Sequence, residues 1–203
     1  MSLIFREGDT DRLLQEMHKS EHDIHAMIVY PDKQILTRLY TDYISKVLQR
    51  NMLVVYVSHY ETIDVVRSNF IKSSALSNES LKEYEKNGSL LVLDNVKTHF
   101  GHEFDILSIT KLLSKRAENQ RKRGAVIMAD MGWYYLEDNV DGLIENELQM
   151  PKRAGMNCST FCLYHKGDFG RLTAGQQDLL RDSHLKSLEM SATKRKRESN
   201  FSH

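Results

Sequence analysis

The sequence predicts an α/β domain with a mainly parallel central sheet and helices on both faces. Short apolar runs rich in β-branched residues alternate with helical patterns along the chain. The run at 52–58 is apolar almost throughout, as in strands that are buried on both faces. The helical patterns between the runs are long enough to return the chain to the sheet in the same direction.

Five strands are expected, in the apolar runs at 26–30, 52–58, 90–93, 125–129 and 159–164. Helical spacing of apolar residues predicts helices between them, at about 35–48, 61–73, 80–86, 104–122, 136–148 and 172–181. Asn87 and Gly88 are a normal stop signal for the third helix, and the basic residues at 121–123 suit the end of the fourth. The strand residues expected inside the sheet are Val55, Val92, Ile127 and Phe161.

The chain divides into three parts. Residues 1–23 are mainly polar, and Leu13, Leu14 and Met17 suggest one or two amphipathic turns, so the segment is expected to be an N-terminal helical extension. Residues 24–190 form the main domain, since no linker interrupts them. Residues 191–203 are a basic tail that is expected to be disordered.

Composition excludes several classes of protein. Basic and acidic side chains balance at 28 each, which argues against a general nucleic-acid or membrane-surface binder. No apolar run reaches the roughly 18 residues of a membrane span, and the first residues lack the apolar core of a signal peptide. Cys158 and Cys162 are too few for a disulfide framework, and along one extended strand they are too far apart to bridge. We expect a cytoplasmic protein with two buried thiols.

A phosphate-binding loop is missing. Such a loop needs glycines between the first strand and its helix, followed by Lys and Ser or Thr. This chain has no glycine between Gly8 and Gly88, and Asp32 in the turn after the first strand would repel phosphate. Asp94 ends an apolar strand as a Walker-B carboxylate does, which is weak support by itself. We expect no ATP hydrolysis and no tight binding of Mg-ATP.

The sequence predicts neither a metal centre nor an enzyme. Two histidine groups have spacings that metal ligands could use, but no cysteine accompanies either of them, and we interpret both as structural or solvated: His18, His22 and His25, and His99 and His102 beside Glu103. No nucleophile elbow and no Ser-His-Asp arrangement is recognisable. We therefore expect no cofactor.

In open parallel sheets, ligands bind beyond the carboxyl ends of the strands. The residues expected to form a ligand site there are Tyr30, His59, Asp130, Trp133 and Tyr164. An aromatic wall with one carboxylate and one imidazole suits a small, mostly apolar molecule. Trp133 could instead be a core residue, in which case its loss would cost stability rather than ligand binding.

Several segments together resemble the MEDS domain, a sensory domain described in methanogens, methylotrophs and the repressor of dichloromethane metabolism. The most specific are Asp130-Met131-Gly132-Trp133 and Cys162-Leu163-Tyr164, supported by His25, 53–58, Asn146-Glu147, Asp168-Phe169 and His184. The likeness covers about residues 24–190. It implies a RecA/KaiC-like fold without a phosphate loop, and sensing of small molecules such as hydrocarbon derivatives.

The chain departs from this family at two places. Leu185 follows His184 where the family often has proline, and His165 follows Tyr164 where an acid is usual, so that the acid is delayed to Asp168. Relatives are often fused to a histidine kinase or a DNA-binding segment, neither of which is recognisable here. Any signalling output is therefore expected to need a separate partner protein.

Three functions are compatible with the sequence. The first is a non-enzymatic small-molecule sensor that acts through a histidine kinase, a transcription regulator or a KaiC-like ATPase. The second is an interaction module that binds such a partner without a ligand of its own. The third is a residual nucleotide-binding protein that uses Asp94 and Asp130 for magnesium, which the missing phosphate loop disfavours.

Overall fold

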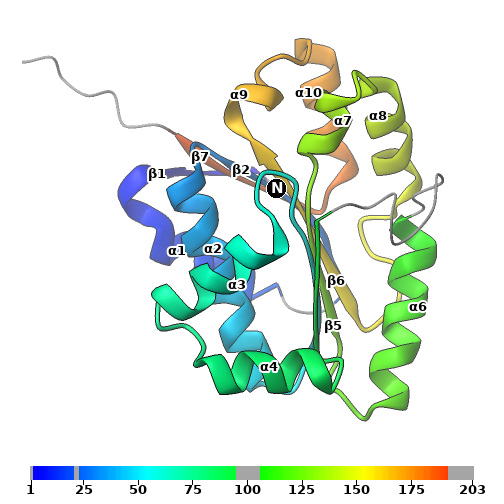
Figure 1. The fold of residues 1–203 in the computed structure, drawn as a ribbon. Coiled ribbons are helices and arrows are strands. Elements are labelled where there is room, and N and C mark those ends of the chain that lie inside the picture. The colour runs from blue at the N-terminus through cyan, green and yellow to red at the C-terminus, as the bar shows by residue number, and fades with distance from the viewer. Residues whose placement is uncertain (1, 21–22, 95–105, 192–203) are drawn as a thin grey trace, which may run out of the picture.

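Seven strands form a single sheet in the computed structural model, which describes residues 2–20, 23–94 and 106–191 (Figure 1). The strand order is β1-β7-β2-β6-β5-β3-β4, and every pairing is parallel. The strands are β1 (Ser2–Arg6), β2 (His25–Tyr30), β3 (Leu53–Val57), β4 (Leu90–Leu93), β5 (Ala125–Asp130), β6 (Cys158–His165) and β7 (Lys186–Ser191). The predicted parallel α/β class is confirmed.

Helices cover both faces of the sheet, as Figure 1 shows. After a 3-10 turn, η1 (Glu7–Asp9), the helices on one face are α1 (Thr10–His18), α2 (Lys33–Gln49), α3 (Ile63–Lys72) and α4 (Asn78–Lys86). On the other face lie α6 (Ile106–Asn119), α7 (Gly132–Leu136), α8 (Val140–Gln149), α9 (Lys166–Phe169) and α10 (Ala174–Ser183). Crossovers through these helices keep the strands parallel.

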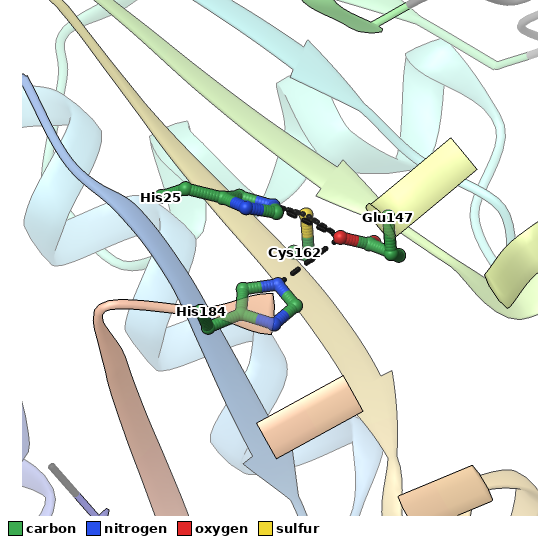
Figure 2. A group of neighbouring side chains, drawn as sticks. All are labelled: His25, Glu147, Cys162 and His184. Carbon is green, nitrogen blue, oxygen red and sulfur yellow. Dashed lines mark hydrogen bonds and ion pairs between the residues drawn. The ribbon is translucent and has the colours of Figure 1, made fainter. Parts of the chain in front are cut away.

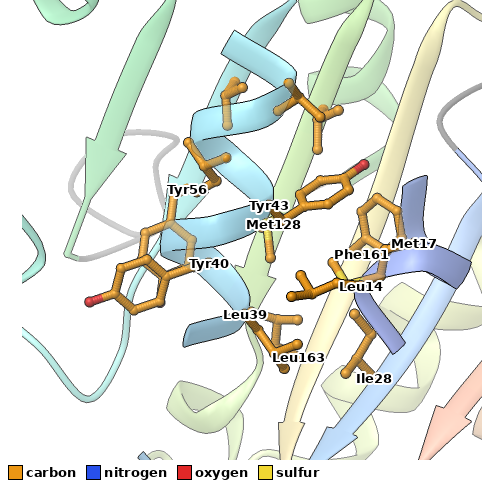
Figure 3. Close-up of a cluster of buried hydrophobic side chains, with 14 of the residues drawn as sticks. Leu14, Met17, Ile28, Leu39, Tyr40, Tyr43, Tyr56, Met128, Phe161 and Leu163 are labelled. Atoms are coloured by element: carbon orange, nitrogen blue, oxygen red, sulfur yellow. The ribbon is translucent and has the colours of Figure 1, made fainter. Parts of the chain in front are cut away.

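Successive side chains of each strand point to opposite faces of the sheet, so the sheet separates two apolar cores. Figure 3 shows part of the core under α1 and α2, where Tyr43 packs edge-on against Phe161 with ring centroids 5.2 Å apart. All four residues that were predicted to be interior are buried: Val55, Val92, Ile127 and Phe161.

The two strands at one side of the sheet were not predicted. Residues 2–6, expected to belong to a helical extension, form the edge strand β1, which pairs with β7. The apolar run of β1 is only Leu3-Ile4-Phe5, with Ile4 76% exposed, and β7 alternates apolar and polar residues, so both lack the signal of a doubly buried strand. The expected helix follows as α1, whose Leu13, Leu14 and Met17 are buried in the core.

The helix expected at 136–148 is α8, which begins only at Val140, and a separate short helix, α7, precedes it. α7 ends at Leu136, and the side chain of Asn139 caps α8 by accepting a hydrogen bond from the backbone N–H of Gly142. Across the three described ranges, no helix has the length and apolar character needed to cross a membrane. His22, Asn95, the group His99, His102 and Glu103, and the tail after residue 191 lie outside the described residues.

Candidate functional site

A pocket of about 320 Å³ lies at the carboxyl end of the sheet, and its lining residues are Tyr30, Lys33, Leu36, Tyr60 and His165. Tyr30 and His165 are paired residues at the ends of the neighbouring strands β2 and β6. The first turns of α2 and the loop after β3 supply the other walls. Aromatic and aliphatic groups dominate this lining, with a lysine and an imidazole as charged or polar groups, as in pockets for small, mainly apolar ligands.

A buried acid lies behind this pocket. The hydroxyl of Tyr30 donates a hydrogen bond of 3.0 Å to Oδ2 of Asp130, and the backbone N–H of Gly132 donates one of 3.0 Å to Oδ1. Burial raises the pKa of Asp130 to about 7, although both hydrogen bonds favour the ionised form. Asp130 therefore changes its charge in the neutral range, one hydrogen bond away from the pocket wall.

Tyr60 separates this pocket from a second one of about 250 Å³, which His59, Gly132, Leu136 and other side chains line. The hydroxyl of Tyr60 donates a hydrogen bond to Oδ2 of Asp168. A Cβ atom on Gly132 would lie 2.5 Å from the ring of His59 and 2.7 Å from the hydroxyl of Tyr60. Glycine at position 132 therefore lets the wall between the two pockets pack tightly against α7.

The start of α2 is unsuited to binding phosphate. Oδ1 of Asp32 accepts a 2.9 Å hydrogen bond from the backbone N–H of Ile35, as an N-cap does. The carboxylate therefore occupies one of the backbone N–H groups that a phosphate would need, and it adds a negative charge beside the other N–H groups of this helix end. This geometry agrees with the missing glycines of the sequence.

The two pockets described above do not bring the predicted ligand residues together. Tyr30 lines the first pocket and contacts Asp130, whereas His59 lines the second pocket. Trp133 is half-buried and lies against Tyr134, with ring centroids 3.8 Å apart, and it lines neither pocket. Tyr164 is fully buried in the core on the other face from Tyr30.

Asp130 and Tyr164, which were expected to share a cavity with Trp133, lie on opposite faces of the sheet, and the strand period explains this separation. Val29 is the partner of Tyr164 in the register of β2 and β6, and His165 is the partner of Tyr30. Because alternate side chains point to opposite faces, His165 reaches the pocket and Tyr164 does not.

Four polar side chains meet inside the core on the α8 side of the sheet, and we call them the internal cluster: His25, Glu147, Cys162 and His184 (Figure 2). They come from β2, α8, β6 and the end of α10, and all are buried. Their potential ligand atoms all lie within 4.8 Å of one another, and imidazole, thiolate and carboxylate are common metal ligands.

Glu147 is at the centre of the internal cluster. Its Oε2 lies 2.9 Å from Nε2 of His25, 3.1 Å from Nε2 of His184 and 3.7 Å from Sγ of Cys162. Its Oε1 accepts a 2.7 Å hydrogen bond from the hydroxyl of Tyr164. Burial opposes charge here, but pairing with the two imidazoles holds the pKa of Glu147 well below its ordinary value. Burial and the second imidazole lower the pKa of His25.

Sequence reasoning missed this cluster as a site. His25 was grouped with His18 by helical spacing, but His18 ends α1 whereas His25 begins β2, so the two share no helix face. His25 and Cys162 lie 137 positions apart, and no local motif joins them to Glu147 and His184. The only feature of the sequence that connects the four residues of the internal cluster is that each lies in a segment that resembles the MEDS domain.

The likeness to one solved structure agrees with the fold. The chain resembles a KaiC-like protein of the archaeon Pyrococcus horikoshii OT3, with 14% identity, 78% of this chain and 70% of that chain covered, and a TM-score of 0.51. A flagellar accessory protein, FlaH of Methanocaldococcus jannaschii, matches with 17% identity, 83% and 71% coverage and a TM-score of 0.44. No curated protein sequence matches the chain.

The profile of one sequence family matches residues 24–184, which is most of the chain. This range contains every residue of the internal cluster and of both pockets. The chain belongs to the MEDS family, the methanogen/methylotroph, DcmR sensory domain.

Proposed function

We propose that this sensory domain binds a small, mostly apolar molecule in the pocket between Tyr30, Tyr60 and His165. The observation that carries the proposal is the pocket's position and lining: about 320 Å³ of mainly apolar space at the carboxyl end of a parallel sheet. The ligand would contact the Tyr30 ring, whose hydroxyl is bonded to Asp130. Binding would in this way be coupled to a buried group that ionises near neutral pH.

We further propose that the domain signals without catalysis and passes its ligand state to a partner protein. The acids beside the pocket are each bonded to a tyrosine, Asp130 to Tyr30 and Asp168 to Tyr60, and are thus engaged in holding the walls. The Asp32 cap at the start of α2 supports the absence of nucleotide chemistry. The partner would be of the signalling kind: a histidine kinase, a transcription regulator or a KaiC-like ATPase.

Thermal-shift measurements with phenol and a series of short-chain primary alcohols test the pocket. These probes combine an apolar body with one hydroxyl, which suits the lining. Two histidines provide a matched pair of variants, because His165 lines the proposed pocket and His59 lines the neighbouring one. A probe at about 100 times its dissociation constant stabilises the native state by roughly 2.7 kcal/mol, which is easily measured.

We expect a probe-induced rise in Tm for the wild type and for His59→Ala, and a much smaller rise for His165→Ala. If no probe raises the Tm of the wild type, or if both variants respond like the wild type, the pocket is not the ligand site. A loss of response in His59→Ala alone would move the site to the second pocket.

A further inference from the structure

We propose that the internal cluster is a binding site for one divalent transition-metal ion, with Zn²⁺ as the best chemical match. Two imidazole nitrogens, one sulfur and one carboxylate oxygen lie within 4.8 Å of one another, and Figure 2 shows both imidazoles and the thiol gathered around the carboxylate of Glu147. These four ligand types are the ones that Zn²⁺ uses in proteins, usually in a tetrahedral arrangement.

The spacing of the ligand atoms fits such an ion. Metal–ligand distances of about 2.0–2.3 Å in a tetrahedron place ligand atoms roughly 3.3–3.8 Å apart. Nε2 of His25 lies 3.4 Å from Sγ of Cys162, and Sγ lies 3.7 Å from Oε2 of Glu147. The distances from Oε2 to the two imidazoles, 2.9 and 3.1 Å, are shorter, and all four ligand atoms lie within 4.8 Å of one another. Binding an ion would therefore require small shifts of these side chains, including a retreat of the Glu147 carboxylate from the imidazoles.

The tautomer of His184 favours a cation in the centre. Its Nδ1 lies 2.6 Å from the carbonyl oxygen of Leu180, which can only accept, so Nδ1 carries a proton. In the neutral ring, Nε2 then presents a lone pair toward the carboxylate of Glu147. Although the two atoms are only 3.1 Å apart, Nε2 makes no hydrogen bond of ordinary geometry. A metal ion between Nε2 and Oε2 would satisfy both lone pairs.

Two of the four proposed ligands, His184 and Glu147, have partners of the kind found in a second coordination shell. Metal-bound histidines usually donate their other N–H to a backbone carbonyl or a carboxylate, and metal-bound carboxylates are themselves hydrogen-bonded. Leu180 accepts from His184 in this way, and the hydroxyl of Tyr164 donates to Oε1 of Glu147. Oε2 is thereby left for the ion.

Charge balance and burial indicate a structural role for the ion. One thiolate, one carboxylate and two neutral imidazoles neutralise a divalent cation, so the complete site adds no net charge to the core. Four protein ligands and full burial leave no open position for substrate, which is typical of structural zinc rather than catalytic zinc. The ion would join β2 and β6 to α8 and the end of α10, and would act independently of the pocket.

The two cysteines allow a matched test on the full chain. Cys158 and Cys162 are both buried on β6, but only Cys162 belongs to the internal cluster. The chain is stripped with a chelator and titrated with Co²⁺, whose thiolate complexes give a near-ultraviolet charge-transfer band that reports a Co–S bond. We expect one equivalent of Co²⁺ to produce the band in the wild type and in Cys158→Ser, and Zn²⁺ to displace it. Cys162→Ser should lose the band.

Two further variants keep the test decisive if Cys162→Ser does not fold. His184→Gln should weaken Co²⁺ binding while the sulfur band persists at high Co²⁺ concentration. Tyr164→Phe, which removes only the hydroxyl that donates to Glu147, should weaken Zn²⁺ binding about 10–100-fold, as loss of a second-shell partner does.

The proposal is wrong if the wild type binds neither ion, in which case a proton-sharing network explains the cluster. It is also wrong if the band survives in Cys162→Ser or vanishes in Cys158→Ser.

Discussion

The hydroxyl of Tyr30 reaches Oδ2 of Asp130 at 3.0 Å, although the strand β6 lies between their own strands β2 and β5. This bond connects the wall of the pocket to an acid that is 1% exposed and has a pKa of about 7. Any ligand that displaces Tyr30 would remove a donor that favours the ionised form of Asp130.

The raised pKa of Asp130 predicts a specific pH dependence of stability. Between pH 3.8, the ordinary pKa of this carboxyl group, and about pH 7, Asp130 keeps its proton in the native state but releases it in the unfolded state. The stabilising contribution is therefore complete below about pH 4 and is lost as the pH rises through about 7. At roughly 1.4 kcal/mol per pKa unit, the free energy of unfolding changes by on the order of 4 kcal/mol.

Urea unfolding of the wild type and of Asp130→Asn at several pH values measures this effect. The difference in unfolding free energy between the two proteins should shift in favour of the variant as the pH rises from about 4 to about 8. A difference that stays constant over this range would show that Asp130 is ionised throughout.

Tyr30→Phe should destabilise the protein by about 1–3 kcal/mol, because it leaves a buried acceptor without its donor. The pKa of Asp130 should rise further, since the lost hydrogen bond favours the ionised form. The cost should consequently be larger at pH 8 than at pH 4. Equal losses of unfolding free energy at pH 4 and pH 8 would contradict the coupling of Tyr30 to the charge of Asp130.

Trp133→Ala should lower the unfolding free energy by about 2–4 kcal/mol, because the indole packs on Tyr134 and the core under α7. The Tm shift induced by phenol should stay unchanged, since Trp133 does not line the pocket. The opposite result, normal stability with a lost phenol response, would restore Trp133 to the ligand site.

Calorimetry with Mg-ATP should detect no micromolar binding. The Asp32 carboxylate occupies the N–H of Ile35 at the start of α2, where a phosphate would have to bind. Micromolar binding that Asp94→Asn or Asp130→Asn abolishes would instead support a residual nucleotide site.

The sequence predicted five strands, β2 to β6, because each contains a run of mostly apolar, buried residues. It did not predict β1 and β7, whose pairing depends on contacts between the two ends of the chain. At the carboxyl edge of the sheet it singled out Tyr30 and Asp130, which are hydrogen-bonded to each other. It chose Tyr164 in place of His165, because a strand's register cannot be read from its composition.

The internal cluster could not be derived from spacing. Glu147 and His184 reach the sheet only through the packing of α8 and α10 against it. A helical pattern fixes which face of a helix is buried, but not which strand residue that face meets. The tertiary structure was needed to bring His25 and Cys162 to the same carboxylate.

Intermolecular NMR contacts provide the most direct measurement of ligand binding in the pocket. Leu36 lines the proposed pocket, whereas Leu136 lines the neighbouring one, so methyl-labelled leucines distinguish the two. With phenol in excess, nuclear Overhauser effects should connect its ring protons to the methyl groups of Leu36 and not to those of Leu136. Contacts to Leu136 alone, or none to either leucine at millimolar phenol, would contradict the proposed ligand site.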